Sequence, residues 1–543
     1  MSDLLDVLII GGFSLSDSSG GGSKTRDRIR LSHKNHYAGT DFIKHLVQSN
    51  ASLEIAERRY ADINKSRLVS RSLNTIYLFD YLIKKGFQTK AVNYFLLEQK
   101  KFEELISFKP EVVVISTTFI SNASEVNIIA KTVKELSPKS TVVVGGMKIL
   151  KSFKKFTLYN QGYFDGFDVK PMISDNFFFD YESDKYIDVF VIEECGEVTL
   201  LELIRKIKNG YDWKTTPNIA YYEKGNLVFT KKVKEPYTFE QNLISWDKIP
   251  EDILGNEIPV MAGMGCPFKC TFCDFTDLHT KVRSRSMDGL ITELKLIQNT
   301  FPGKSIFFTD DNLFTTKKRT KQLCEAIVQN GLSFKWRGFF RADAISQENV
   351  DIIAKSGCSV GLLGVESGDN EILRNMKKRE TREQTLKAVN LLNENGISTI
   401  STFMVGFPGE TEESVNRTIS LLNSYPDNNR TLNKYYPLVF LLCPLSPIAS
   451  PENRMKYGIK GSYERWSHNT MNSEEAKEHF ARCFQEINRP TVSYLEYIDP
   501  DIPFSNLKDI FKARNNLVKS GINVIEESNV SLVYQAFKKI LSH

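Results

Sequence analysis

Two long stretches of this sequence alternate short apolar runs, rich in β-branched residues, with segments of helical periodicity. Parallel strands need a long crossover connection and are buried on both faces, so this alternation is typical of parallel sheets covered by helices. The sequence therefore predicts an α/β protein with two sheet-containing domains. In the first stretch the apolar runs lie at 6–10, 91–95, 111–116, 141–146 and 189–192, with a periodic helix at 73–85.

We predict four parts from these patterns. Residues 1–215 form a Rossmann-like domain, 216–254 a hairpin and linker, 255–445 a partial (β/α)6 barrel, and 446–543 a small, mostly helical C-terminal region. Six strands are expected in the second domain, near 258–264, 305–310, 335–342, 359–366, 397–406 and 434–442. Helices are expected near 347–355, 381–395, 473–487 and 530–541.

Composition excludes several classes of protein. A hydrophobic share of 41% with no apolar run near about 18 residues argues against a membrane span. Lys and Arg exceed Asp and Glu by only 71 − 66 = 5, without a dense basic block, so a nucleic-acid partner is not expected. Residues 1–12 lack a basic n-region, and five cysteines stand far apart, which together favour a reducing, cytoplasmic location.

Three further cysteines are close together. Cys266, Cys270 and Cys273 have the spacing C-x3-C-x2-C at the end of an apolar segment. Three thiolates can hold three irons of a [4Fe–4S] cluster and leave one iron open to an exogenous ligand. The alternatives are a structural zinc site or three unrelated buried cysteines. Zinc fits poorly, because a closed site needs four ligands and no second pair follows.

This cysteine run resembles the signature of radical S-adenosylmethionine (radical SAM) enzymes, and Phe272 matches the aromatic residue usual before the third cysteine. The resemblance implies that the open iron chelates the amine and carboxylate of SAM. Four later strand ends also resemble their radical SAM counterparts: Phe308-Thr-Asp-Asp-Asn312, Arg337 to Asp343, Gly364-Val-Glu-Ser-Gly368 and Phe403 to Glu410.

The same resemblance implies roles in SAM binding. Glu366 and Ser367 would lie near the methionine ammonium, Arg341 near the carboxylate or ribose, and the run Gly406, Phe407, Pro408 beside the adenine. The alternatives are an ion pair between Glu366 and Arg341 and a plain turn at Gly-Phe-Pro-Gly. A buried carboxylate needs either a ligand or a partner.

Asp310 and Asp311 are adjacent carboxylates after the second barrel strand. Neighbouring strand residues point to opposite faces, so only one of them should enter the barrel. We expect Asp310 or Asn312 to order SAM or the substrate and not to carry out the chemistry.

Turn residues follow the strands of the first domain, where ligands of open parallel sheets bind. They are candidate cofactor contacts: Gly11, Gly12, Ser116, Thr117, Gly145, Gly146, Gly196 and Glu197. Their order ahead of the cysteine run resembles the cobalamin-binding domain of cobalamin-dependent radical SAM enzymes. The alternative is a flavodoxin-like domain without a ligand.

One histidine bears on cobalt ligation. The cobalt-ligating motif D-x-H-x-x-G has its nearest match at Lys34-Asn-His36-Tyr-Ala-Gly39, where lysine replaces the aspartate that would orient His36. We expect a loop histidine. The segment that contains it, 14–71, is longer than ordinary connections, and loops of such length are usually functional lids or disordered. Near the other end, Trp466 and His468 either close over the active site or pack at a helix start. Their run, 465–471, is also similar to that of radical SAM enzymes that methylate phosphinates.

The resemblance implies a cobalamin-dependent radical SAM methyltransferase that uses a [4Fe–4S] cluster, SAM and cobalamin. It would methylate an unactivated carbon, or a phosphinate phosphorus, of a small biosynthetic intermediate. Because the cofactors supply the chemistry, no side chain is assigned a catalytic role. A small-molecule substrate and an electron donor such as flavodoxin or ferredoxin are the expected partners, with no nucleic acid and no membrane. The alternatives are a non-methylating radical SAM enzyme that binds cobalamin and a non-catalytic iron–sulfur or cobalamin sensor.

Overall fold

The computed structural model describes residues 5–12, 71–95, 98–120, 122–164, 168–236, 242–255, 257–275, 282–428 and 430–492. The described residues up to Pro259 form one compact unit and those from Val260 form a second. His36, nearly all of the segment 14–71 and the expected helix at 530–541 lie outside the described residues. The α/β class is confirmed in both units.

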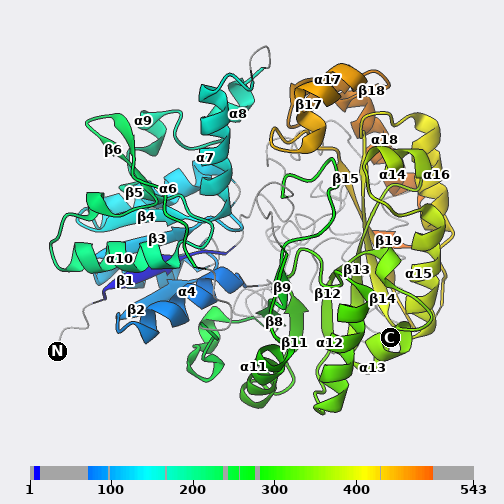
Figure 1. Cartoon of the computed structure of the whole chain (residues 1–543), viewed down its shortest axis with the longest axis horizontal. Coiled ribbons are helices and arrows are strands. Elements are labelled where there is room, and N and C mark those ends of the chain that lie inside the picture. Colours follow the sequence, from blue (N-terminus) through cyan, green and yellow to red (C-terminus); the bar gives the residue numbers. More distant parts are fainter. Residues whose placement is uncertain are drawn as a thin grey trace, which may run out of the picture. The chain divides into compact units, whose positions relative to one another are not determined.

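The first unit is built on a seven-stranded sheet in the order β2-β1-β3-β4-β5-β6-β7, in which β1 to β5 pair in parallel. Helices lie on both faces of this sheet (Figure 1), which explains why its strands read as unbroken apolar runs. The strands are β1 (Val7–Ile10), β2 (Thr89–Val92), β3 (Val112–Ser116), β4 (Thr141–Gly145) and β5 (Val189–Val191). The helices include α4 (Leu73–Lys84), α5 (Gln99–Ser107), α6 (Ala123–Leu136), α7 (Met147–Asn160) and α10 (Glu197–Lys208).

The predicted hairpin is present and belongs to this sheet. Strands β6 (Ile219–Glu223) and β7 (Asn226–Phe229) pair with each other, and β6 pairs antiparallel with β5. The segment after the hairpin also packs in the first unit, because Asn93 donates from its carboxamide to the carbonyl of Ile253 at 3.1 Å. The region that the sequence marks as a linker is thus part of the first compact unit.

The second unit contains a sheet in the order β19-β15-β14-β13-β12-β11-β8. Its six longer strands match the six that the sequence predicts, and the short β19 (Thr491–Val492) pairs with β15 at one edge. The strands are β8 (Glu257–Val260), β11 (Ser305–Phe308), β12 (Trp336–Phe340), β13 (Cys358–Glu366), β14 (Ser398–Val405) and β15 (Asn433–Val439). The connecting helices are α11 (Met287–Thr300), α12 (Lys317–Gln329), α13 (Val350–Lys355), α14 (Asn370–Asn375), α15 (Arg382–Glu394) and α16 (Glu412–Asn423).

After β15 the chain adds elements that the sequence only partly predicts. The expected helix is α18 (Ser473–Glu486), which begins with a capping box between Asn472 and Glu475. The three-stranded antiparallel sheet of β16 (Lys460–Ser462), β17 (Arg465–His468) and β18 (Met471–Asn472) was not expected. Among the described residues no helix combines the length and apolar character that crossing a bilayer demands.

Candidate functional site

The three clustered cysteines lie in the loop that follows β8. The ends of this loop are held by a small antiparallel pair, β9 (Gly263–Met264) and β10 (Arg283–Ser284). The amide of Thr271 donates to the carbonyl of Met376 at 2.9 Å, and its own carbonyl accepts from the amide of Ile448 at 2.8 Å. The backbone between the second and third cysteines is therefore fixed from two sides.

None of the three cysteines forms a disulfide, and Phe272, between the second and the third, is half-buried. Burial raises the pKa of Cys270 and raises that of Cys273 to about 12, so a metal must displace a proton from each thiol to bind. No three His, Cys, Asp or Glu side chains in the described part of the chain are arranged as metal ligands. Three sulfur donors on one fixed loop suit a cluster with one open iron, provided that the thiols turn toward a common point.

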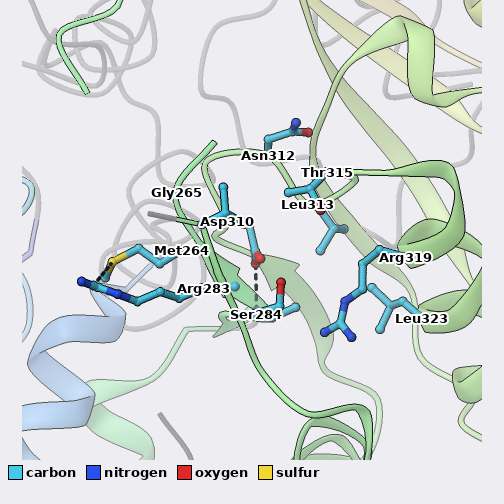
Figure 2. A pocket seen from close by; sticks show the side chains of 13 residues that line it. Met264, Gly265, Arg283, Ser284, Asp310, Asn312, Leu313, Thr315, Arg319 and Leu323 are labelled. Carbon is cyan, nitrogen blue, oxygen red and sulfur yellow. Dashed lines mark hydrogen bonds between the residues drawn. The ribbon is translucent and has the colours of Figure 1, made fainter. Parts of the chain in front are cut away.

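The end of β11 supports the segment that leads to the first cysteine. The Asp310 carboxylate accepts from the amide of Ala262 at 2.9 Å, and the Asp311 carboxylate accepts from the amide of Gly265 at 2.9 Å. Burial raises the pKa of Asp310 to about 7. Figure 2 shows the Asp310 carboxylate directed toward Ser284, away from the Asn312 carboxamide. Both carboxylates thus contact the same backbone segment, although only one was expected to enter the barrel.

Arg341 and Glu366 both have charged partners, but they do not pair with each other. Arg341 lies 3.1 Å from Asp343 and 3.4 Å from Glu380, and its guanidinium stacks 3.7 Å from the ring centre of Phe268 in the cysteine loop. Glu366 has a positive φ of 63° and lies 3.6 Å from the ammonium of Lys378. The proposed alternative of a Glu366–Arg341 pair is therefore wrong for this structure.

Lys378 and Glu380 were missed by the sequence analysis. Both are nearly inaccessible, and the Lys378 ammonium lies 3.5 Å from Glu380 as well as contacting Glu366. In the sequence they belong to the charged run Lys377-Lys-Arg-Glu380, which looks like a solvated loop. Lys378 and its two carboxylate partners thus place buried charges of both signs next to the cysteine loop. A zwitterionic ligand, which also carries both signs, could replace the partner of each of these groups.

Ser367 lies next to Glu366 and is fully buried. Its hydroxyl accepts from the amide of Asp369 at 3.1 Å and lies 3.4 Å from the Thr418 hydroxyl of α16. Asp369 in turn caps α14 by accepting from its first amides. Ser367 therefore positions the turn after β13 in this structure.

The turn after β14 contains the predicted adenine-binding run. Gly406 has a φ of +96°, and Phe407 and Pro408 are buried beside it. The Glu410 carboxylate, which the sequence analysis did not single out, accepts from the amides of Gly406 and Phe407. Burial raises the pKa of Glu410 to about 8.

Trp466 and His468 of β17 cover this turn. His468 Nε2 lies 3.2 Å from the carbonyl of Gly406, and burial lowers the His468 pKa, so the neutral ring donates there. The Trp466 ring stacks on His468 with centroids 5.2 Å apart and donates to the carbonyl of Phe440 at 2.9 Å. Strand β17 also packs against α18, as expected for residues near a helix start, and closure over the active site stays a prediction.

In the first unit the candidate residues lie at the carboxyl edge of the sheet. The strand order reverses between β1 and β3, which is where open α/β sheets bind ligands. Gly12 and Ser116 flank this position, and Gly11 lies so close to α4 that a Cβ would lie 1.9 Å from the Thr75 hydroxyl. A Cβ on Gly12 would lie 2.3 Å from the carbonyl oxygen of Asn93.

Neighbouring strand ends add polar groups to this edge. Thr117 donates from its amide and its hydroxyl to the carbonyl of Gly145, both at 2.8 Å, and Gly146 begins α7 with a φ of +108°. Gly196 precedes α10, and the Glu197 carboxylate accepts from the Tyr77 hydroxyl at 3.3 Å. Burial raises the pKa of Glu197. Tyr77, on α4, was not identified from the sequence.

Comparison with known proteins identifies the second unit. Residues 260–422 match the model of the Radical SAM superfamily. An uncharacterized methyltransferase of Pyrococcus horikoshii is 29% identical over 42% of this chain and 51% of its own length. The anaerobic magnesium-protoporphyrin IX monomethyl ester cyclase of Rubrivivax gelatinosus is 23% identical over 67% of this chain and 64% of its own. The chain thus spans only about half to two thirds of these relatives.

Two solved structures share the fold over most of the chain. The radical SAM methyltransferase TsrM of Kitasatospora setae, with cobalamin and a [4Fe–4S] cluster bound, has a TM-score of 0.56 at 14% identity and covers 87% of this chain and 96% of its own. OxsB, a cobalamin-dependent SAM radical enzyme with aqua-cobalamin bound, has a TM-score of 0.56 at 15% identity. The match covers 99% of this chain and 80% of the OxsB chain. Residues 260–422 are thus a domain of the Radical SAM superfamily, and the fold over most of the chain is similar to that of TsrM and OxsB.

Proposed function

We propose that this chain is a cobalamin-dependent radical SAM methyltransferase acting on a small biosynthetic intermediate, at an unactivated carbon or a phosphinate phosphorus. The observation that carries the proposal is the three-thiol loop, fixed at the carboxyl end of the first strand of a radical SAM fold. When bound, the cluster and SAM supply a 5′-deoxyadenosyl radical, and methylcobalamin supplies the methyl group.

The residues of the second unit would bind and orient SAM. Cys266, Cys270 and Cys273 would hold the cluster. Glu366 would accept from the SAM ammonium in place of Lys378, which contacts it at 3.6 Å in this structure. Arg341 is held by Asp343 and Phe268 with its positive charge beside the cysteine loop, where it would attract the SAM carboxylate. The Gly406 turn under Trp466 would border the adenine and exclude water.

The first unit would hold cobalamin at the carboxyl edge of its sheet, around the reversal between β1 and β3. Supporting this, both structural neighbours described above have cobalamin bound. The reducing electron would come from a small donor protein such as flavodoxin or ferredoxin, with neither nucleic acid nor membrane as a partner.

Anaerobic reconstitution with iron, sulfide and hydroxocobalamin tests the cofactor set. We expect about four irons per chain, as a [4Fe–4S] cluster requires, and cobalt retained after desalting. Cys270→Ala should lose the iron, whereas Cys324→Ala, which alters a buried cysteine of α12, should keep it. Iron retained by Cys270→Ala would refute the cluster assignment.

The products of SAM separate methyl transfer from other reactions. A methyltransferase of this kind forms both S-adenosylhomocysteine and 5′-deoxyadenosine in the presence of its substrate. A second candidate, a non-methylating cyclase, is favoured by the match to the protoporphyrin ester cyclase, which spans more of the chain than the methyltransferase match. Formation of 5′-deoxyadenosine without S-adenosylhomocysteine would support the cyclase, and SAM binding without cleavage under strong reductant would refute both.

A further inference from the structure

Three consecutive residues after β11 contact the segment that delivers the first cysteine. Asp310 and Asp311 accept from the backbone amides of Ala262 and Gly265, as described above, and Asn312 continues the series by contacting a side chain. The Asn312 carboxamide nitrogen lies 3.9 Å from the sulfur of Cys266. The strand end thus supports the backbone before the first cysteine and also reaches the cysteine itself.

The burial of Asn312 makes its orientation informative. Its exposed fraction is 4%, and its carboxamide oxygen is buried without a hydrogen-bond partner among the described residues. The residue lines a small pocket beside Asp310, Thr315 and Arg319 (Figure 2). The opposite orientation of the amide would place its oxygen against the Cys266 sulfur, which is unfavourable once that sulfur carries negative charge.

A neutral thiol is a weak hydrogen-bond acceptor, whereas a thiolate bound to iron carries negative charge and accepts more strongly. Hydrogen bonds to the sulfurs of an iron–sulfur cluster are among the factors that set its reduction potential. They stabilise the more negative, reduced state more than the oxidised state, so they raise the potential. An amide donor at Cys266 would therefore ease the electron uptake that precedes SAM cleavage.

We propose that Asn312 is a positioning residue for the cluster, whose carboxamide N–H donates to the Cys266 thiolate and raises the reduction potential of the cluster. The inference rests on the proposed function, because it requires the cluster held by the three cysteines. It assigns Asn312 to the iron–sulfur centre, where the sequence suggested a contact with SAM or substrate.

The test compares two variants of this residue with a matched control. Asn312→Leu removes the donor at similar volume, and Asn312→Asp replaces the donor with an acceptor of the same shape. Asn433→Leu is the control, because Asn433 is equally buried but bonds to Asn393 and Thr399 at the first residue of β15. All proteins are reconstituted without SAM and titrated anaerobically, with the reduced cluster followed by electron paramagnetic resonance.

We expect Asn312→Leu to keep its iron while the equilibrium constant for one-electron reduction falls about tenfold, equivalent to about 59 mV. Asn312→Asp should shift further in the same direction, and Asn433→Leu should leave the potential unchanged. In the wild type, electron–nuclear double resonance should detect a proton, exchangeable in D2O, that is coupled to the cluster and absent from both Asn312 variants. This last signal does not depend on how stable the variants are.

Two results would overturn the inference. One is a wild-type potential and proton coupling in Asn312→Leu, and the other is an equal shift in Asn433→Leu. If the wild-type protein takes up no cluster, the proposed function fails first and this inference with it. If it takes up a cluster whose reduction potential and proton coupling are the same in the Asn312 variants, only the inference fails.

Discussion

Substituting Gly406 by alanine should damage the turn after β14 through two separable effects. The φ of +96° is a conformation that side chains rarely adopt, which costs about 1–3 kcal/mol. The new Cβ would also lie 2.5 Å from Cη2 of Trp466 and 2.7 Å from Cβ of Ala476, and such overpacking costs about 1–3 kcal/mol. The sum predicts a loss of about 2–6 kcal/mol in the free energy of unfolding.

Gly396→Ala separates the two effects. Gly396 also has a positive φ, of +77°, but a Cβ there would meet nothing within 4 Å, so only the conformational cost remains. Urea unfolding followed by tryptophan fluorescence should show a clearly smaller loss for Gly396→Ala than for Gly406→Ala. Calorimetry on the reconstituted enzyme should show weakened SAM binding for Gly406→Ala alone.

A double-mutant cycle tests the cause. Replacing Trp466 by leucine removes the ring that the new methyl group would meet, so the losses of Gly406→Ala and Trp466→Leu should sum to more than the loss of the double variant, by about 1–3 kcal/mol. If Gly406→Ala unfolds like Gly396→Ala and binds SAM normally, or if the cycle shows no coupling, the turn is not enclosed by Trp466 as described.

Three other predictions concern buried charge and the first unit. Lys378→Met leaves Glu366 and Glu380 without their cation and should lower the free energy of unfolding by about 3–5 kcal/mol at pH 8. The loss should be smaller at pH 5, where the carboxyls can take up protons. Equal losses at both pH values in urea unfolding would contradict this. Burial raises the pKa of the Glu410 carboxyl from its ordinary value of 4.5 to about 8 in the folded protein. The folded state therefore holds a proton that the unfolded state releases, and the free energy of unfolding falls by about 1.4 kcal/mol per pH unit as the pH rises between these values. Unfolding curves across that range should lose this slope in Glu410→Gln, and an unchanged slope would place the titration elsewhere. Gly12→Ala, whose Cβ would lie 2.3 Å from a backbone carbonyl oxygen, should reduce cobalt retention while iron uptake stays normal; metal analysis showing iron lost with the cobalt would refute the separation.

The longer elements of the fold could be predicted because parallel strands buried on both faces are continuous apolar runs. All six strands expected in the barrel are present, and the helix expected at 381–395 is α15, which begins at the capping box of Thr381 and Gln384. The antiparallel pairs β9–β10 and β16–β18 were missed because strands of two to four residues are too short to show a period.

Site residues could be predicted from the sequence only where the residue type is rare or where several of them lie close together in the chain. Cys266, Cys270 and Cys273 meet both conditions. Lys378 and Glu410 do not, because charged residues are expected in water and their burial depends on partners that only the fold brings near. Lys378 and Glu366 are separated in the chain by a helix and two loops, and no sequence pattern predicts their contact.

The pairing of β19 with β15 has a consequence for the edge of the sheet in the second unit. The backbone of β15 at Lys434 and Tyr435 pairs with Thr491 and Val492, and α18 packs against the same strand. A fragment ending at the predicted boundary, residue 445, would lack both and present β15 as an unpaired edge, which invites strand addition between copies. The segment that follows the sixth strand thus covers this edge and prevents strand addition there. A fragment intended to fold alone should extend at least to Val492.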